Sequence, residues 1–448
     1  MSAQTLSLEE WLTVIEEKIE NNQLKQANSI KLQLTALITN ENKALLCQAL
    51  YKRGWSAFNN KHFSIAELLF SWLAELDSKN WQVHLANAML KQQLNNQAQA
   101  IQQFRGFVSE NPIYSYQLST NPQAIKIAVL VTLGSELIRF NKGGFSIANG
   151  LTDIEHLLKS SNYSVALLFV EGIVAKDLDA FDCIINAVSD SDLYYQQMLQ
   201  LQNILKTCTK PIINHPKYSI LTTRDYISQY TPLTAGIIIP KLIRVTLKDD
   251  SANTLNDAIE QHALRYPLLI RSAGTQNGTH FILLKDKQDS DNYHAISGDY
   301  YLSEYYDFKS QDGFYRKYRC WSIGNTITLT HSLFSEHWNV HSSSRMATMS
   351  KHPWMAKEEQ QFINGDFLEK NSKINTLISA LKQSAQLDCF GVDFAFMNTG
   401  EILLFEANAT MLSSIPAERV TLFPYLQDML NYHKHAFAEL IKQKITAL

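Results

Sequence analysis

The sequence predicts an α+β protein of several domains: an all-α helical repeat array, then a parallel α/β domain, then a mixed α+β domain. Three observations lead to this prediction. Apolar residues recur every three or four positions up to about residue 120, continuous apolar runs alternate with helical stretches after Pro122, and shorter strand-like runs fill the remainder. We therefore expect domains over residues 1–120, 121–210 and 211–448.

The composition is that of a folded, nearly neutral protein. Hydrophobic residues make up 45% and charged residues 19%, and 40 Lys+Arg against 43 Asp+Glu give a formal charge of −3. This balance argues against a nucleic-acid partner, and every apolar run is far shorter than the roughly 18 residues that a membrane span needs. The acidic start lacks the pattern of a secretory signal, and the five cysteines are scattered, so we expect a cytoplasmic protein with reduced thiols.

A repeat of 34 residues is visible within the first domain. Ala66 and Phe70 recur as Ala100 and Phe104, and each copy ends in a turn. A helical hairpin of this length, with small and aromatic residues at these positions, resembles the tetratricopeptide repeat. A generic helical bundle is the alternative. Because such arrays bind peptides on a concave surface, a peptide or protein partner is expected. A scaffolding or dimerising role is the alternative, and a homodimer stays open.

Apolar strands alternate with helices in the second domain. Continuous β-branched runs indicate strands that are buried on both faces, and therefore a parallel sheet covered by helices. The runs are 124–135, 163–172 and 181–192, the last ending in Asp190 and Asp192. In the third domain we expect strands within 236–247, 267–274, 279–286, 318–330 and 389–409, and helices over 356–388 in pieces and over 425–445.

The segment 389–411 holds the most informative polar residues. Two expected strands flank a turn at 398–400, with Asp393 at the centre of the first strand and Glu406 and Asn408 on one face of the second. A charge within apolar sequence is costly unless a metal or partner compensates it. Converging oxygen ligands suit Mg²⁺ that also binds ATP phosphates. A hairpin with scattered polar residues is the alternative.

These residues, in GVDF followed by a glycine turn and ILLFEANATM, resemble the metal-binding hairpin of the ATP-grasp superfamily. The resemblance covers about residues 124–448. It implies a pre-ATP-grasp domain over 121–210 and a two-lobed ATP-grasp domain over 211–448. It also implies that Asp393, Glu406 and Asn408 bind Mg²⁺, and that the chain is an ADP-forming ligase. Such a ligase joins a carboxylate to an amine or thiol through an acyl-phosphate.

The segment PLLIRSAGTQNGTH (267–280) is the candidate phosphate loop. Gly274 and Gly278 permit tight turns that bring backbone N–H groups close to phosphates, although such a sequence also forms ordinary hairpins. By the resemblance, this loop closes over the ATP triphosphate. Arg271 takes the place of the usual lysine, and the two side chains are not equivalent. A second basic contact comes from Arg224 or Lys241, between which the sequence does not decide.

Residues 303–324 resemble the linker between the two ATP-grasp lobes. Adenine would then lie beside Tyr305, Tyr306 and Asp307 of this linker. The two tyrosine rings are equally consistent with ordinary packing. Lys317 and Arg319 share one face of their strand. If that face lines the cleft, Lys317 contacts the nucleotide and Arg319 holds the γ-phosphate and the acyl-phosphate. Arg271, in the place of the usual lysine, is the other candidate catalytic residue. A solvated basic edge is the alternative.

The segment 331–354 contains four histidines. His337 and His341 are spaced like a metal pair, but no HExxH motif is present. We expect a loop over the acceptor substrate, which His331 or Arg345 contacts, with plain surface as the alternative. Two other functions stay open: an ATP-grasp kinase of a small molecule, and a non-catalytic nucleotide-binding or scaffold protein.

Overall fold

The computed structural model describes residues 7–134, 139–141, 144–146, 150–248, 252–275, 281–364 and 367–447. These residues form two compact units. The first is mainly Met1–Tyr114, and the second is Ser115–Thr132, Asn149–Val170 and Val174–Leu448. The predicted α+β class with an all-α N-terminal region is confirmed. The division into three domains stays a prediction.

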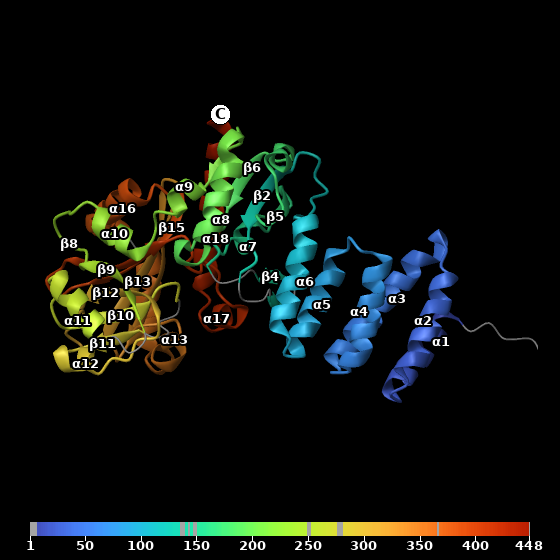
Figure 1. The fold of residues 1–448 in the computed structure, drawn as a ribbon. Helices are drawn as coiled ribbons and strands as arrows, with labels where there is room; N and C mark the ends of the chain where they lie inside the picture. Colours follow the sequence, from blue (N-terminus) through green and yellow to red (C-terminus); the bar gives the residue numbers. More distant parts are fainter. Residues whose placement is uncertain are drawn as a thin grey trace, which may run out of the picture. The chain divides into compact units, whose positions relative to one another are not determined.

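The first unit is built from six helices (Figure 1). They are α1 (Leu8–Glu20), α2 (Leu24–Ala36), α3 (Asn40–Asn59), α4 (Phe63–Leu76), α5 (Trp81–Gln93) and α6 (Gln97–Glu110). They pack as the pairs α1–α2, α3–α4 and α5–α6, and α4 also contacts α5. The repeated residues of the 34-residue period are all buried: Ala66, Phe70, Ala100 and Phe104. The helical array is therefore present, while its assignment to the tetratricopeptide family stays a prediction.

The helical region ends earlier than the sequence suggests. Residues Ile113–Gln117 form strand β1, so the prediction of helix up to about residue 120 is wrong at its end. Pro112 disfavours helical backbone at the preceding residue and stops α6, and the following IYSYQ alternates aromatic and polar side chains as strands do.

Gly54 of α3 lies against the ring of Phe70 on α4. A Cβ atom at Gly54 would lie 2.5 Å from Phe70 Cε1, and this ring is fully buried. We expect Gly54→Ala to destabilise the packing of α3 against α4 by about 1–3 kcal/mol of unfolding free energy, because overpacking outweighs the better helix propensity of alanine. Faster amide hydrogen exchange in α3 and α4 would show this. Gly106→Ala on α6, where a Cβ meets nothing within 4 Å, is the control and should not destabilise.

The second unit contains a sheet with the strand order β1-β5-β2-β6-β7. Its strands β2 (Ile125–Val131), β5 (Tyr163–Phe169), β6 (Cys183–Asn186) and β7 (Ile212–Ile213) pair in parallel. The three predicted strands are thus confirmed. After β6 the chain enters α8 (Ser191–Ile204), whose first turn is capped by the Asp190 carboxylate accepting from the backbone N–H groups of Asp192 and Leu193.

Two further sheets of the second unit carry the candidate site. One is antiparallel with the order β11-β10-β12-β9, and the other has the order β14-β13-β15-β16-β8. Their strands are β8 (Ile237–Ile238), β9 (Leu242–Leu247), β10 (Leu268–Ser272), β11 (Ile282–Leu284), β12 (Gly298–Glu304), β13 (Tyr315–Ile323), β14 (Thr326–Ser335), β15 (Cys389–Phe396) and β16 (Ile402–Asn408). The expected strand over 236–247 is therefore split between two sheets, and β12 was not expected.

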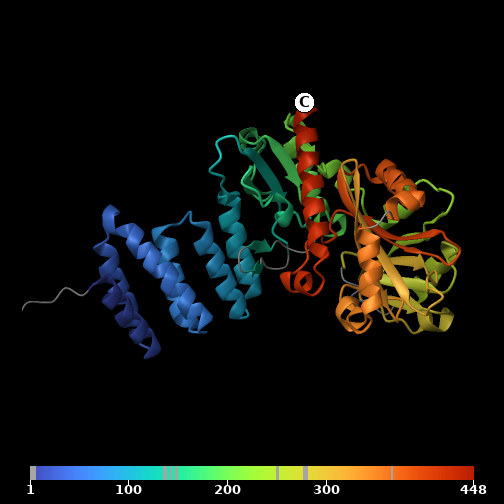
Figure 2. The same ribbon diagram turned by 180° about the vertical axis from the view of Figure 1, so that it is seen from behind.

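Helices and short turns complete the described chain (Figures 1 and 2). They are α7 (Glu155–Leu158), α9 (Pro216–Ser219), α10 (Arg224–Tyr230), α11 (Ala252–Gln261), α12 (Lys287–Asp291), α13 (Ser344–Ala347), α14 (Pro353–Asn364), α15 (Phe367–Lys370), α16 (Ser372–Ala385), α17 (Ala417–Leu422) and α18 (Leu426–Thr446). Short 3₁₀ turns cover Ala175–Ala180, Leu205–Thr207 and Met349–Lys351, and a strand pair in the first unit covers Arg139–Asn141 and Gly144–Ser146. Across the described residues, every helix is too short or too polar to span a bilayer.

The long helix α18 contacts strands of both five-stranded sheets (Figure 2). Its His433 is fully buried, and neither ring nitrogen has a hydrogen-bond partner among the described residues. Burial, assisted by the nearby His156, lowers the pKa of His433 to about 3. The neutral ring is therefore the form that packs in the folded protein.

Acid should destabilise the fold through His433. A histidine whose folded-state pKa is lowered binds its proton mainly in the unfolded chain, so stability is lost as pH falls below the unfolded pKa of about 6.5. Between pH 7.5 and 5.5 the wild type should lose about 1.4 kcal/mol of unfolding free energy through His433, and His433→Leu should not show this loss. Urea unfolding at both pH values measures it. His435→Leu, on the exposed side of the same helix, should keep the pH dependence of the wild type.

Candidate nucleotide and metal site

The hairpin β15–β16 places the three predicted metal ligands together. Asp393 lies opposite Glu406 in the antiparallel register, and Asn408 lies opposite Gly391. A register shift follows Asp393, and such bulges change the direction of side chains at functional sites. Asn408 Nδ2 donates a hydrogen bond to Glu406 Oε1 at 2.6 Å, so both side chains lie on one face as predicted.

Asp393 is held by two cations of the neighbouring strand β13. Arg319 Nε and Nη2 donate to its two oxygens at 2.6 and 2.9 Å, and Lys317 Nζ lies 3.1 Å away. Burial alone would raise the pKa of Asp393, but Arg319 and Lys317 outweigh it and hold the pKa well below its usual range. The carboxylate is therefore ionised, and Lys317 and Arg319 share one face of their strand.

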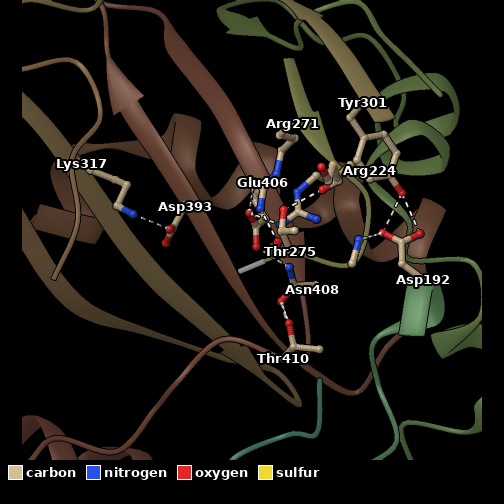
Figure 3. Close-up of polar contacts among 12 residues, drawn as sticks. Asp192, Arg224, Arg271, Thr275, Tyr301, Lys317, Asp393, Glu406, Asn408 and Thr410 are labelled. Carbon is tan, nitrogen blue, oxygen red and sulfur yellow. Dashed lines mark hydrogen bonds and ion pairs between the residues drawn. The ribbon is translucent and has the colours of Figure 1, made fainter. Parts of the chain in front are cut away.

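Glu406 is held by two arginines from other elements. Arg224, the first residue of α10, donates to Glu406 Oε2 at 2.8 Å, and Arg271 Nη1 at the end of β10 lies 4.0 Å from the same oxygen (Figure 3). Burial favours the neutral acid, but both arginines oppose it and lower the pKa of Glu406 to about 2. Of the two open candidates for a second basic contact, the structure brings Arg224 into the cluster.

We call Arg224, Arg271, Lys317, Arg319, Asp393 and Glu406 the charged cluster. Four cations against two carboxylates leave it a formal charge of +2. The Nε atoms of Arg224 and Arg271 are buried and lack a hydrogen-bond partner among the described residues. Burial and the charge of Arg224 lower the pKa of Arg271 to about 10, which still leaves it protonated at neutral pH. Buried unsatisfied donors are unfavourable, so the cluster is suited to an anionic ligand.

A small pocket of about 40 Å³, open to solvent, lies beside the charged cluster. Arg224 and Glu406 belong to its lining, which is otherwise largely apolar. The apolar residues include Ile227, Ile239, Pro240, Leu242, Leu404 and Phe405. This pocket is far smaller than the roughly 300–1,000 Å³ of typical small-molecule sites, so the charged cluster, and not the pocket, is the feature that suits a ligand.

The donor set fits a magnesium ion by its chemistry. Asp393 and Glu406 offer carboxylate oxygens and Asn408 an amide oxygen, which are hard ligands. Asn408 Oδ1 now accepts hydrogen bonds from Thr410 N and Oγ1 at 3.0 and 2.8 Å. Within the described residues, no group of three or more His, Cys, Asp and Glu could hold a metal, and this includes His337 and His341.

The other predicted contacts lie in different surroundings. His331 lies opposite Arg319 in the β13–β14 register, and its buried Nε2 has no hydrogen-bond partner among the described residues. Arg345 is buried and ion-paired with Glu359, an arrangement that favours a structural role. Lys241 Nζ donates to the carbonyl of His262 instead of reaching the cluster. Substrate contact by His331 or Arg345 stays a prediction.

The predicted linker and loop residues are only partly described. Tyr305, Tyr306 and Asp307 follow β12, and Tyr305 packs edge-on against Trp338 at 6.0 Å between ring centroids. Adenine contact there stays a prediction. Gly274 has a φ of +69°, which favours glycine, whereas Gly278 lies outside the described residues.

Asp192 and Tyr301 were not foreseen as site residues. Tyr301 donates to the Asp192 oxygens at 2.8 and 2.9 Å, and the tyrosine ring lies 5.9 Å from the Arg224 guanidinium (Figure 3). One signal was available in the sequence. Asp192 follows the carboxyl end of a parallel strand, the edge at which open α/β sheets bind ligands.

The chain matches no family model and no curated protein. Among solved structures it is similar to an ATP-grasp RimK domain protein from Sphaerobacter thermophilus (12% identity, 68% of this chain and 99% of that chain, TM-score 0.40). It is also similar to D-alanyl-alanine synthetase A from Vibrio cholerae (13%, 73% and 99%, 0.42) and to the D-alanine-D-alanine ligase from Coxiella burnetii (11%, 71% and 97%, 0.37). At such identities and TM-scores no activity can be transferred, so the function depends on the chain's own residues.

Proposed function

We propose that this chain is an ATP- and Mg²⁺-dependent, ADP-forming ligase that joins a carboxylate to an amine or thiol. The charged cluster is the observation that carries the proposal. Its formal charge of +2 suits a polyphosphate, as do its buried arginine Nε atoms, which have no hydrogen-bond partner in the part of the chain that the structure describes. The hairpin beside it presents the oxygen donors that a magnesium ion requires.

Each charged residue has a part in this proposal. Arg224, Arg271 and Lys317 bind phosphate oxygens, and Arg319 binds the γ-phosphate and the acyl-phosphate. Arginine suits these contacts because its planar guanidinium can pair with phosphate through two hydrogen bonds. Asp393, Glu406 and Asn408 would hold magnesium, which when bound neutralises phosphate charge. Adenine lies beside residues 305–307.

The reaction that the sequence resemblance implies has two steps. A substrate carboxylate oxygen attacks the γ-phosphorus, the bond to the β–γ bridging oxygen breaks, and ADP leaves. The nucleophile then attacks the acyl carbon, the acyl C–O bond breaks, and phosphate and one proton are released. The protein contributes orientation, fixed positive charge and exclusion of water from the acyl-phosphate.

The helical array supports a peptide or protein as substrate or carrier. Three helix pairs stacked in series form an extended surface, which repeat proteins use to bind protein segments. A cytoplasmic location and the tetratricopeptide assignment belong to the same proposal.

Mg²⁺-dependent ATP consumption tests the proposal. The full chain is incubated with ATP, pooled amino acids and short peptides, and the products are resolved. ADP and free phosphate that form only when carboxylate and nucleophile are both present would support the ligase. Phosphate attached to an acceptor would make the protein a kinase. Absence of Mg²⁺-ATP binding by titration would overturn both enzyme functions.

A further inference from the structure

Asp192 is buried at the start of α8 and receives hydrogen bonds from three elements of the β9–β12 sheet region. Tyr301 on β12 donates at 2.8 and 2.9 Å, Arg244 Nη2 on β9 lies 3.0 Å away, and the backbone N–H of Gly274 after β10 donates at 3.3 Å. Only 5% of the Asp192 side chain is exposed. A buried carboxylate is tolerated when its charge is paired and its oxygens are hydrogen-bonded, and Asp192 meets both conditions.

These partners lead directly to the charged cluster. The guanidinium groups of Arg224 and Arg244 lie 5.9 and 5.5 Å from the centroid of the Tyr301 ring. Arg224 in turn donates to Glu406 at 2.8 Å. Removing the Asp192 charge therefore leaves Arg244, in the described part of the chain, with only the partly exposed Asp299, at 3.2 Å, as a counterion. It also removes the hydrogen-bond acceptor of Tyr301, against whose ring Arg224 lies.

We call residues 273–275 the glycine turn. Gly274 lies directly on the first turn of α8: a Cβ added there would lie 2.9 Å from Leu193 Cδ2. Arg271 Nη2 donates to the carbonyl of Thr275, so the glycine turn is held by Arg271 on one side and by Asp192 on the other. The position of the turn thus depends on α8, which belongs to the parallel-sheet region.

We propose that Asp192 is a positioning residue for the nucleotide phosphates, which fixes the glycine turn and, through Tyr301, the Arg224 side chain. The inference rests on the proposed function, because it takes the ligand of the charged cluster to be ATP. Asp192 does not itself occupy the phosphate position. Its shortest polar contacts, at 2.8–3.0 Å, are to side chains of strands β9 and β12, and its near-complete burial keeps it away from an entering ligand.

Calorimetric titration of the full chain with ATP and with AMP, both with Mg²⁺, tests this role. In Asp192→Asn we expect ATP affinity to fall about tenfold or more, as when a supporting hydrogen-bond partner is removed. AMP affinity should change less than about twofold, because AMP lacks the β- and γ-phosphates that the glycine turn would contact. Tyr301→Phe should shift ATP affinity in the same direction. Asp182→Asn, which removes a carboxylate bonded to Lys126 N elsewhere in the parallel-sheet region, is the matched control.

The outcomes separate this inference from the proposed function. If the wild type binds no ATP, the proposed function fails. If the wild type binds ATP and Asp192→Asn binds it equally well, positioning by Asp192 is wrong. Tighter ATP binding by the variant would also overturn the inference, since the carboxylate would then compete with phosphate. Equal loss of ATP and AMP affinity would overturn the inference too, because the effect would then not depend on the β- and γ-phosphates.

Discussion

Replacing Glu406 by glutamine is expected to lower Mg²⁺-dependent ATP turnover about 100-fold, the usual cost of removing one charge-stabilising group from an active site. At neutral pH Glu406 is ionised, because Arg224 and Arg271 lower its pKa to about 2. Glutamine keeps the size of the side chain and removes the charge that a magnesium ion requires. Turnover is measured with the carboxylate and nucleophile that the wild type uses.

In the absence of metal, ATP binding by Glu406→Gln should not fall as turnover does. The variant raises the formal charge of the charged cluster by one, so ATP affinity in EDTA should stay the same or rise. Glu401→Gln is the matched control: it lies in the turn of the same hairpin, where Glu401 accepts a hydrogen bond from Thr399 Oγ1 at 2.9 Å. Turnover of Glu406→Gln at the rate of this control would contradict the metal role. Loss of ATP binding in EDTA would instead show that Glu406 mainly orients the arginines.

The elements predicted best from the sequence are those formed by one continuous run of buried apolar residues. Strands β2, β5 and β6 are apolar and buried over most of their length, because parallel strands are covered on both faces. The split at Pro240 and the strand β12 were missed. Proline ends one short strand before the next begins in another sheet. In β12 only Tyr300, Tyr301 and Leu302 are buried, which is too short a run to distinguish from a linker.

For the candidate site too, contacts within one hairpin could be predicted, whereas contacts between distant segments could not. Spacing within one hairpin predicts that Asp393, Glu406 and Asn408 converge, since side chains alternate along a strand. The partner of Glu406 is not local: Arg224 lies 182 residues earlier in the chain. The sequence alone could not choose it over Lys241, because both are basic residues near an expected helix or strand. Only the packing of α10 against β16 separates them.

Replacing Glu359 by glutamine is expected to destabilise the fold by about 3–5 kcal/mol, because it leaves Arg345 as a buried charge without a counterion. Glu359 is fully buried and Arg345 is 4% exposed. The carboxylate also accepts hydrogen bonds from Tyr425 Oη at 2.6 Å and from Ser332 N at 3.2 Å, so it connects α14, β14 and the segment before α18. Urea unfolding of the full chain measures the effect.

The neighbouring residue provides a matched control. Glu358 pairs with Arg316 at 2.9 Å, but 38% of its side chain is exposed. Glu358→Gln should therefore cost only about 0–1 kcal/mol, as is usual for solvent-exposed ion pairs. Replacing both members of the buried pair by apolar residues, Arg345→Met with Glu359→Leu, should recover much of the stability, because no unpaired charge then remains. If Glu359→Gln costs no more than Glu358→Gln, the Arg345 charge does not depend on Glu359. Arg345 would then be available for the substrate contact that the sequence predicts.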